Sequence, residues 1–379
     1  MYQIIKRLSK QKYEELMKQG YILPGHNGPY IDQETPVRNT SHWLILFGYM
    51  YLKTKDEKYY DAVVKSADFL INPINRPEDA TFYCRNKEGK DQSNGLIGQA
   101  WTIEALAEAY KVTNKMIYLD TAIEVFLLHP FDKKAGLWKV VETNGVIKSF
   151  DMTFNHQLWF AMSGAILLSL KPNDKIKQNL ECFFSRLNKH FRVSKAGLIR
   201  HHIIDNSTFK EKTKNILREI KRIVYKSVKN KSLKYKENGY HLFNMYAFAV
   251  IKNEGYNLDF FESKMFSKSL RYSFSKELHR ELLDNQHETD ISNLPVNKKI
   301  KVNRYGYGYN GPGFELPFIY QTFKGHEFIQ YNIEAIIQKQ KELTYNEVWG
   351  LFQNNTEDSL TLTARIYEIT RYFKLLENK

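Results

Sequence analysis

The clearest pattern along the chain is an alternation of strongly apolar segments with segments that carry one apolar face. Three segments have apolar side chains on nearly every turn: 41–53, 96–111 and 156–170. Each is followed by a segment with a charged face: 57–71, 116–128 and 175–191. Helices that are apolar all round are buried, whereas amphipathic helices lie at a surface. Each pair therefore predicts a helical hairpin with an inner and an outer helix.

The hairpins recur with a fixed period. Trp43, Trp101 and Trp159 lie 58 residues apart, at similar points of the three inner helices, and such a period is typical of a repeat architecture. Further pairs are predicted at these ranges: 239–252 with 257–274, 312–323 with 326–341, and 357–376 with 3–18. Six such hairpins predict an all-α, closed two-layer ring, an (α/α)6 toroid, in which residues 1–379 form a single domain.

Residues 205–238 interrupt this period. Between Lys210 and Lys236 there are eleven Lys or Arg residues and only two acidic ones, and apolar residues recur there at helical spacing. We interpret 205–238 as a basic helical insertion within the toroid. A basic amphipathic helix is typical of contact with a membrane surface or a partner, so 210–236 is the candidate for such a contact. Residues 284–303 are expected to form a polar loop.

The net charge of +14 over 379 residues favours an acidic partner, such as nucleic acid, anionic lipid or an acidic sugar polymer. Because the sequence contains no zinc-finger, RRM or helix-turn-helix pattern, we expect no nucleic-acid partner. No apolar run approaches the ~20 residues of a membrane span. The N-terminus lacks the apolar segment of a secretory signal, so we expect a cytoplasmic protein. No pattern indicates an oligomeric state.

Polar and aromatic side chains gather where the inner helices begin, and in a ring of hairpins these N-terminal ends converge on one mouth. Amide and carboxylate groups bind sugar hydroxyls, and aromatic rings stack on the apolar faces of sugar rings. The alternative is that the Asn residues only cap helices. The predicted substrate-binding residues are Arg38, His42, Trp43, Asn94, Gln99, Trp101, Asn155, Gln157, Trp159, Tyr240, His241, Arg304, Tyr305, Tyr307 and Asn310.

Two carboxylates are the first candidates for catalysis. Asp91 and Asp151 occupy equivalent places in successive repeats, so we expect them to face each other across the mouth. Paired carboxylates are the usual machinery of glycoside hydrolysis. The alternative is that both only stabilise helix N-termini through the helix dipole. Glu315, which follows a run of tyrosines and glycines, is a third candidate acid or base.

Histidines provide a second kind of candidate chemistry. His42, His156 and His241 belong to different repeats, and the sequence has no HxxxH or HxH pair that would support a metal site. We therefore expect neither a metal nor a cofactor. His156 is a candidate acid or base, and in an epimerase or lyase the base would be His156, His241 or a tyrosine. His201 and His202 form a local pair with a weaker case for substrate binding.

The segments Asp91-Gln-Ser-Asn-Gly95-Leu and Asp151-Met-Thr-Phe-Asn155 precede the second and third inner helices. In this they resemble the six-hairpin glycosidase-like enzymes, most closely the unsaturated glucuronyl and unsaturated rhamnogalacturonyl hydrolases. The resemblance extends over most of residues 1–379 and implies an (α/α)6 toroid. It also implies that Asp151 protonates an unsaturated uronyl ring and then activates water, with Asp91 assisting. N-acylglucosamine 2-epimerases have the same ring and use paired histidines, a role that His156 and His241 would serve.

The expected function is therefore a glycoside hydrolase that acts on an acidic, uronic-acid-containing oligosaccharide or polysaccharide by carboxylate acid/base catalysis. The first alternative is a sugar epimerase or a polysaccharide lyase on the same scaffold. The second is a non-catalytic glycan-binding toroid that uses residues 210–236 as its contact.

Overall fold

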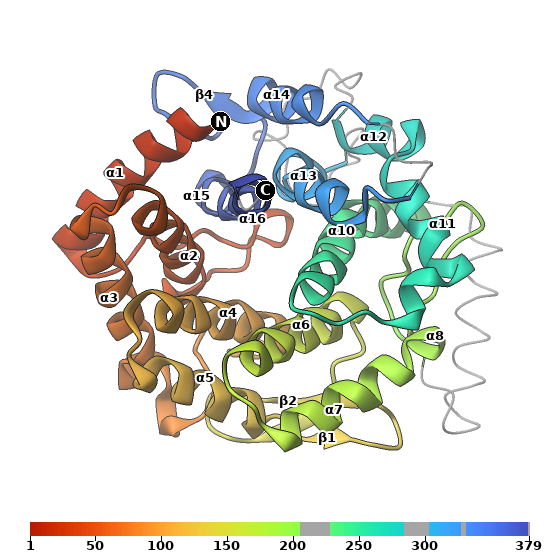
Figure 1. Ribbon diagram of the computed structural model, residues 1–379, viewed down its shortest axis with the longest axis horizontal. Helices are drawn as coiled ribbons and strands as arrows, with labels where there is room; N and C mark the ends of the chain where they lie inside the picture. Colours follow the sequence, from red (N-terminus) through yellow and green to blue (C-terminus); the bar gives the residue numbers. More distant parts are fainter. Residues whose placement is uncertain (205–227, 284–302, 327–330, 378–379) are drawn as a thin grey trace.

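A computed structural model describes residues 1–204, 228–283, 303–326 and 331–377, with the backbone alone for 228–232. Its helices form two concentric layers around a central axis (Figure 1). The inner layer consists of α2 (Val37–Thr54), α4 (Gly95–Thr113), α6 (Phe154–Leu170), α10 (Val228–Asn253), α13 (Pro312–Phe323) and α16 (Tyr367–Glu377). The outer layer consists of α1 (Tyr2–Gln19), α3 (Glu57–Ile71), α5 (Met116–Leu128), α7 (Asp174–Ser185), α11 (Lys264–Ser273) and α14 (Ile333–Thr344). This alternation confirms the predicted (α/α)6 toroid.

The burial of each layer follows from its sequence pattern. In α2 every residue from Val37 to Met50 is buried, whereas α3 buries only one side. Polar side chains begin the outer helices: the Asp56 carboxylate accepts from the Lys58 amide, and Asn173 accepts from the amides of Lys175 and Ile176. Such caps satisfy donors that a helix start leaves free. The predicted bounds of α3 and α5 are confirmed.

Several predicted bounds were wrong. Helix α2 begins at Val37, directly after Pro36, so Arg38 and Asn39 lie in its first turn and not in a preceding loop. Helix α10 begins at Val228, so residues 228–238 of the predicted insertion extend the fourth inner helix. The remainder of the insertion, 205–227, and the predicted loop 284–302 lie outside the described residues.

Three outer or final segments are broken where one helix was predicted. The range 175–191 divides into α7 and α8 (Leu187–His190), and the range 257–274 divides into η4 (Asp259–Glu262) and α11. A further helix, α12 (Lys276–Leu283), follows α11. The range 357–376 divides at Arg365 into α15 (Ser359–Ala364) and α16. Short 3-10 turns complete the described helical elements: η1 (Gly28–Tyr30), η2 (Pro73–Asn75) and η3 (Pro77–Asp79).

A small antiparallel sheet follows α5 and was not predicted. It has the order β1 (Phe131–Asp132), β2 (Leu137–Val141), β3 (Ile147–Phe150), and a second pair joins β4 (Tyr345–Asn346) to β5 (Leu351–Phe352). The Gln157 side chain joins α6 to β2 through two hydrogen bonds. It accepts from the Trp138 backbone amide at 3.0 Å and donates to the Trp138 carbonyl at 2.8 Å. The sheet thus leads the chain directly to Asp151 at the start of α6.

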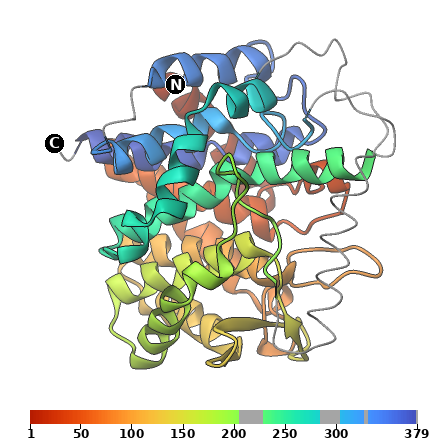
Figure 2. The ribbon, with the colours of Figure 1, turned by 90° about the vertical axis from the view of Figure 1, so that its right-hand side faces the viewer.

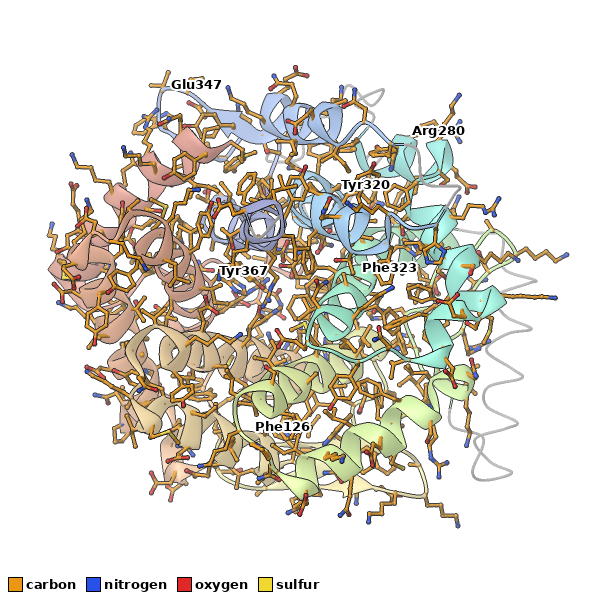
Figure 3. All side chains as sticks on the ribbon, in the orientation of Figure 1. Phe126, Arg280, Tyr320, Phe323, Glu347 and Tyr367 are labelled. Atoms are coloured by element: carbon orange, nitrogen blue, oxygen red, sulfur yellow. The ribbon has the colours of Figure 1, made fainter. Side chains whose placement is uncertain are left out.

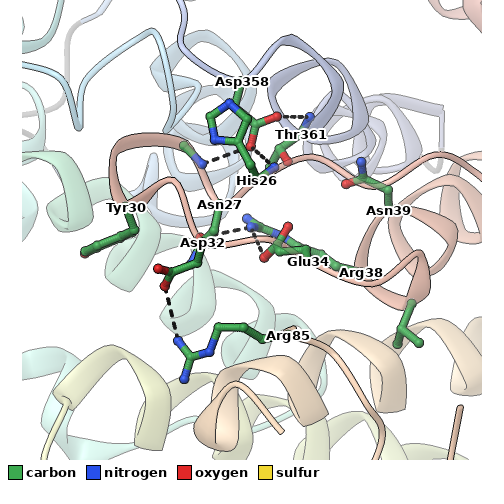
Figure 4. Close-up of polar contacts among 12 residues, drawn as sticks. His26, Asn27, Tyr30, Asp32, Glu34, Arg38, Asn39, Arg85, Asp358 and Thr361 are labelled. Atoms are coloured by element: carbon green, nitrogen blue, oxygen red, sulfur yellow. Dashed lines mark hydrogen bonds and ion pairs between the residues drawn. The ribbon is translucent and has the colours of Figure 1, made fainter. Parts of the chain in front are cut away.

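The two ends of the chain close the ring. In Figure 1, α16 stands in the inner layer between α13 and α2, and α1 stands in the outer layer between α14 and α3. The carboxylate of Asp358, at the start of α15, accepts from the backbone amides of His26 at 3.1 Å and Gly28 at 2.9 Å (Figure 4). These bonds anchor the long loop between α1 and α2.

The centre of the ring is filled by side chains rather than left open. Figure 3 shows Tyr367 near the centre, whereas Arg280 and Glu347 lie at the rim. Two ion pairs join inner helices α4 and α16: Arg371 with Glu104 at 2.6 Å, and Lys374 with Glu108 at 2.7 Å. Seen from the side, the end of α16 lies toward one end of the molecule and the start of α10 at the other (Figure 2). Among the described helices none is long and apolar enough to cross a membrane.

The pair between Arg371 and Glu104 gives a test of the closed ring. Burial raises the pKa of Glu104, and Arg371 partly offsets this effect. Because Arg371→Met leaves a buried carboxylate without its cation, we expect the free energy of unfolding at pH 7 to fall by about 3–5 kcal/mol. Urea denaturation measures this change.

Two further variants control for the loss of charge alone. In Lys53→Met the lost pair with Glu377 is exposed on both sides, so a change below about 1 kcal/mol is expected. Adding Glu104→Gln to Arg371→Met should recover most of the stability. If Arg371→Met unfolds at the urea concentration of the wild type, α4 and α16 do not meet as described.

Candidate active site

A cavity of about 170 Å³ opens where the N-terminal sides of the inner helices meet. All the described inner helices contribute to its lining: Arg38 from α2, Trp101 from α4, His156 from α6, Tyr240 from α10, Asn310 from the residues before α13 and Arg365 from the residues before α16. The ring geometry predicts such a mouth, and the structure places one there.

Seven of the predicted site residues line the cavity: Arg38, Asn94, Trp101, Asn155, His156, Tyr240 and Asn310. Asn155 is buried, and its side-chain oxygen has no hydrogen-bond partner among the described residues. An amide oxygen in this state is an acceptor available to a sugar hydroxyl. The positions of these seven residues therefore agree with the prediction that amides and aromatic rings gather at the mouth.

Other predicted binding residues lie in the core and hold the scaffold. Trp43 and Trp159 are fully buried away from the cavity, and the Trp159 indole donates to the Phe243 carbonyl at 3.1 Å. The Gln99 amide bonds the backbone of Phe82 at 2.8 and 3.0 Å, as Gln157 does for Trp138. The 58-residue period of the tryptophans therefore reflects how the repeats pack on one another. Of the three tryptophans, only Trp101 lines the cavity.

Five more predicted binding residues also lie outside the lining. His42 stacks on Tyr367, and His241 bonds the Ser269 carbonyl at 3.1 Å. Arg304 forms an ion pair with Glu357 at 2.7 Å and donates to the Pro29 carbonyl. Tyr305 packs on Tyr30, and Tyr307 is buried. These side chains therefore pack within the protein and do not line the cavity.

A short polar contact at the mouth joins Asp151 to His156. The Asp151 carboxylate is 2.7 Å from His156 Nδ1 and also accepts from the amides of Thr153 at 3.1 Å and Leu96 at 3.3 Å. Burial acts to raise the pKa of Asp151, but His156 and these amides outweigh it and hold the pKa below its ordinary value. Asp151 is therefore an ionised acceptor, and His156 Nδ1 must carry the proton.

His156 is the part of this pair that faces the cavity. It is the one residue of α6 between Phe154 and Leu167 that is not buried, and it lines the cavity, whereas Asp151 does not. Because Nδ1 is bonded to Asp151, Nε2 is the nitrogen left for a substrate. An imidazole held in one tautomer by a carboxylate is a common acid/base arrangement.

Gly95 makes room for this pair at the start of α4. Its φ is +59°, and a Cβ atom there would lie 2.7 Å from Asp151 Oδ2 and 3.2 Å from His156 Nδ1. The same residue's amide donates to Asp91 Oδ1 at 2.6 Å. Asp91 and Asp151 therefore flank one glycine, and neither lines the cavity.

The other two candidate carboxylates act as counterions. Asp91 pairs with Arg85 at 2.5 Å and accepts from Ser93 at 3.1 Å. Glu315 is completely buried, where its carboxylate pairs with Arg365 at 2.7 Å, and burial raises its pKa. The expectation that Asp91 and Asp151 face each other across the mouth is wrong, because both are turned to the backbone and side chains of the wall.

His201 lines the cavity, although its sequence pattern indicated substrate binding only weakly. The chain around it pairs with the segment before α6: Phe154 donates to the His201 carbonyl at 2.9 Å, and Ile203 donates to the Met152 carbonyl at 2.9 Å. This places His201 in the cavity that His156 lines. Burial, with Lys236, His202 and His156 nearby, lowers the pKa of His201 well below its ordinary value, so its imidazole is neutral at pH 7.

The loop between α1 and α2 supplies a further wall that sequence reasoning missed. Asn27, Tyr30 and Asp32 line the cavity, and the neighbouring Glu34 pairs with Arg38 at 2.9 Å (Figure 4). The Tyr30 hydroxyl lies 3.0 Å from that of Tyr240. Contacts with residues distant in sequence, such as Asp358 and Arg304, hold this loop over the mouth, and no local pattern marks them.

Cations dominate the lining. The lining cations are Arg38, Arg85, Lys90, Lys236 and Arg365, whereas Asp32 is the only lining carboxylate among the described residues. Asp32 is bonded by Lys90 at 2.6 and 2.8 Å and lies 3.6 Å from Arg85. Such a lining favours a negatively charged ligand. Within the described part of the chain, no group of three or more His, Cys, Asp or Glu side chains is arranged to hold a metal ion.

Solved structures define the class of fold. The model resembles cellobiose 2-epimerase from Bacillus thermoamylovorans with a TM-score of 0.63 and 12% identity, over 99% of this chain and 100% of that one. It resembles an unsaturated glucuronyl hydrolase specific for heparin with a TM-score of 0.56 and 12% identity, over 100% and 99%. The chain thus has the six-hairpin (α/α)6 fold that sugar epimerases and glycosidases share, as the sequence predicted.

A closer relative defines the family. The archaeal glycosylation protein Q of Haloferax volcanii is 33% identical over 361 residues, which cover 93% of this chain and 92% of that protein. The chain belongs to the family of archaeal glycosylation protein Q. It matches no family model.

Gly95 provides a test of the pair between Asp151 and His156. Gly95→Ala adds a Cβ that must displace Asp151 Oδ2, so we expect the hydrogen bond between Asp151 and His156 to break. In the ¹H–¹⁵N NMR spectrum of the histidine rings, the His156 Nδ1 signal should move, and the backbone strain should cost about 1–2 kcal/mol.

Gly89→Ala is the matched control, because Gly89 also has a positive φ, +74°, but nothing lies within 4 Å of its added Cβ. It should show the backbone cost without any change at His156. An unchanged His156 signal in Gly95→Ala would contradict the described geometry.

Proposed function

We propose that this protein is a carbohydrate-active enzyme that moves a proton on a carbon atom of an acidic sugar, in a reaction of the epimerase or isomerase type. The observation that carries the proposal is the presence of two imidazoles in one cavity. His156 is held through Nδ1 by Asp151, and His201 is kept neutral by burial. The two rings therefore have different surroundings, and titratable groups in different surroundings are suited to opposite acid and base roles.

In the proposed reaction the neutral His201 takes the proton from a carbon next to a carbonyl group. The C–H bond breaks, the proton passes to a ring nitrogen of His201, and the electron pair forms an enolate. His156 then delivers a proton from Nε2, while Asp151 stabilises its positive charge before the transfer. When the proton returns to the opposite face, the configuration at that carbon is inverted and no water is consumed.

The rest of the cavity supports a sugar as the ligand. Asn155 presents an unpartnered oxygen, while Tyr240 and Phe243 add aromatic surface. The volume of about 170 Å³ is below the ~300–1,000 Å³ of typical drug-sized pockets, which favours one sugar unit or the end of a chain. The cationic lining favours an acidic sugar. The relative in Haloferax volcanii is named a glycosylation protein, which agrees with carbohydrate as the substrate class.

The second candidate function is the glycoside hydrolase first expected from the sequence. The likeness to the fold of an unsaturated glucuronyl hydrolase is the observation that favours it. This function requires Asp151 to donate a proton to the substrate. A lowered pKa and three hydrogen-bond donors oppose this role. In addition, the only carboxylate that lines the described cavity, Asp32, is already paired with Lys90.

Proton exchange with solvent separates the candidates. The protein is incubated in D₂O with uronic acids and their disaccharides, and ¹H NMR follows the carbon-bound protons. Under the proposal deuterium enters one carbon position, and His156→Gln and His201→Gln each slow its entry by roughly 10²–10⁴-fold because one proton-transfer group is lost. Asp151→Asn should also slow it, since the tautomer of His156 is no longer held.

His202→Gln is the matched control, because His202 is the exposed neighbour of His201 and does not line the cavity. It should exchange at the wild-type rate. Release of reducing sugar, lost in Asp151→Asn and kept in His201→Gln, would establish the glycosidase instead. Binding without either reaction would establish a glycan-binding toroid.

A further inference from the structure

The cations of the cavity differ in one respect, which is whether a carboxylate already neutralises them. Arg38 pairs with Glu34 at 2.9 Å and Arg85 pairs with Asp91 at 2.5 Å. Lys90 binds both oxygens of Asp32, and Arg365 pairs with Glu315 and Glu368, each at 2.7 Å. Lys236 alone among the lining cations has no carboxylate and no hydrogen-bond partner among the described residues.

Lys236 is half-buried at the wall of the cavity. It lies on α10 with its side chain in the cavity, although the sequence pattern had placed it at the end of the surface-contact segment. Its ammonium is 5.2 Å from the centre of the Tyr30 ring, and the Lys90 ammonium is 5.7 Å from the same ring. Burial, with Lys90 close by, lowers the pKa of Lys236 to about 8.

We infer that Lys236 binds the carboxylate of the sugar and thereby selects a uronic acid over a neutral hexose. An ammonium placed in a cavity beside a second cation is stabilised by an anion that the protein itself does not supply, so the ligand supplies it. One unneutralised cation matches one negative charge. This favours a carboxylate over a phosphate monoester, which carries nearly two. The inference rests on the proposed function in that it places a sugar in this cavity.

Binding measurements test the inference without requiring turnover. Isothermal titration calorimetry is performed on the full-length protein at pH 7 with glucuronate, galacturonate, glucose, galactose and glucose 6-phosphate. The wild type should bind at least one uronate at least roughly tenfold more tightly than the matching hexose, since a charged hydrogen bond is at stake. Lys236→Met should weaken uronate binding roughly 10- to 100-fold and leave hexose binding unchanged. Lys236→Arg, which keeps the charge, should retain the preference.

Lys234→Met is the matched control. Lys234 lies on the same helix, but its side chain is exposed and 3.7 Å from both Glu277 and Glu281. This variant should bind the uronate as the wild type does. Thermal melting of each variant shows whether the fold is kept.

Three outcomes overturn the inference: a uronate preference that survives in Lys236→Met, a wild type without any such preference, or tighter binding of glucose 6-phosphate than of either uronate. Failure of the proposed chemistry gives a different result. Selective uronate binding that depends on Lys236, in a protein that shows no deuterium exchange, would remove the acid/base proposal and leave Lys236 as the carboxylate-binding residue. His156→Gln should retain the preference in either case.

Discussion

The rest of the structure depends on the need to bury helices that are apolar on every side. Helices α2, α4 and α6 have almost no polar face along their length. A helix of this kind avoids water only if neighbours surround it, and a closed ring of hairpins provides them with an outer helix behind each inner one. The polar groups then have room at the helix ends, and the parallel arrangement of the inner helices brings their N-terminal ends together at one mouth.

Charge buried inside this ring is held in pairs. Arg371 with Glu104 and Arg365 with Glu315 join segments of the inner layer that are distant in sequence. Such pairs add little net stability, because desolvation offsets attraction, but each partner depends strongly on the other. They therefore specify which helices meet when the ring closes. Lys236 departs from this rule, and it does so inside the cavity.

The candidate site combines rigid helix starts with segments that are ordered only by long-range contacts. Asp151 and His156 stand at the first turn of α6, where Gly95 from the neighbouring repeat admits them closely. His201 and Tyr30 lie on loops. The loop of His201 pairs with the segment before α6, and the loop of Tyr30 is anchored by Asp358. Helix starts fix the proton-transfer pair, and the loops complete the wall around it.

Sequence alone determined the toroid, because the spacing of apolar residues is a local property that helix geometry converts directly into inner and outer faces. It also indicated the mouth and residues such as Asn155, His156 and Trp101, since these lie beside helix starts that the pattern marks. It misassigned Trp43, Trp159 and His241, because the sequence of a helix does not reveal whether a side chain turns toward the cavity or toward the neighbouring helix.

The tertiary structure alone decided which side chains meet. In the folded chain the Asp151 carboxylate accepts hydrogen bonds from His156 and from two backbone amides, so it holds the His156 ring and is not a free acid. These donors come together around Asp151 only when the chain folds. The tertiary structure also brought His201, Tyr30 and Lys236 into one cavity from segments far apart in sequence, and it neutralised every other lining cation with a carboxylate. Protonation and pairing depend on distances between distant residues, and no local pattern carries that information.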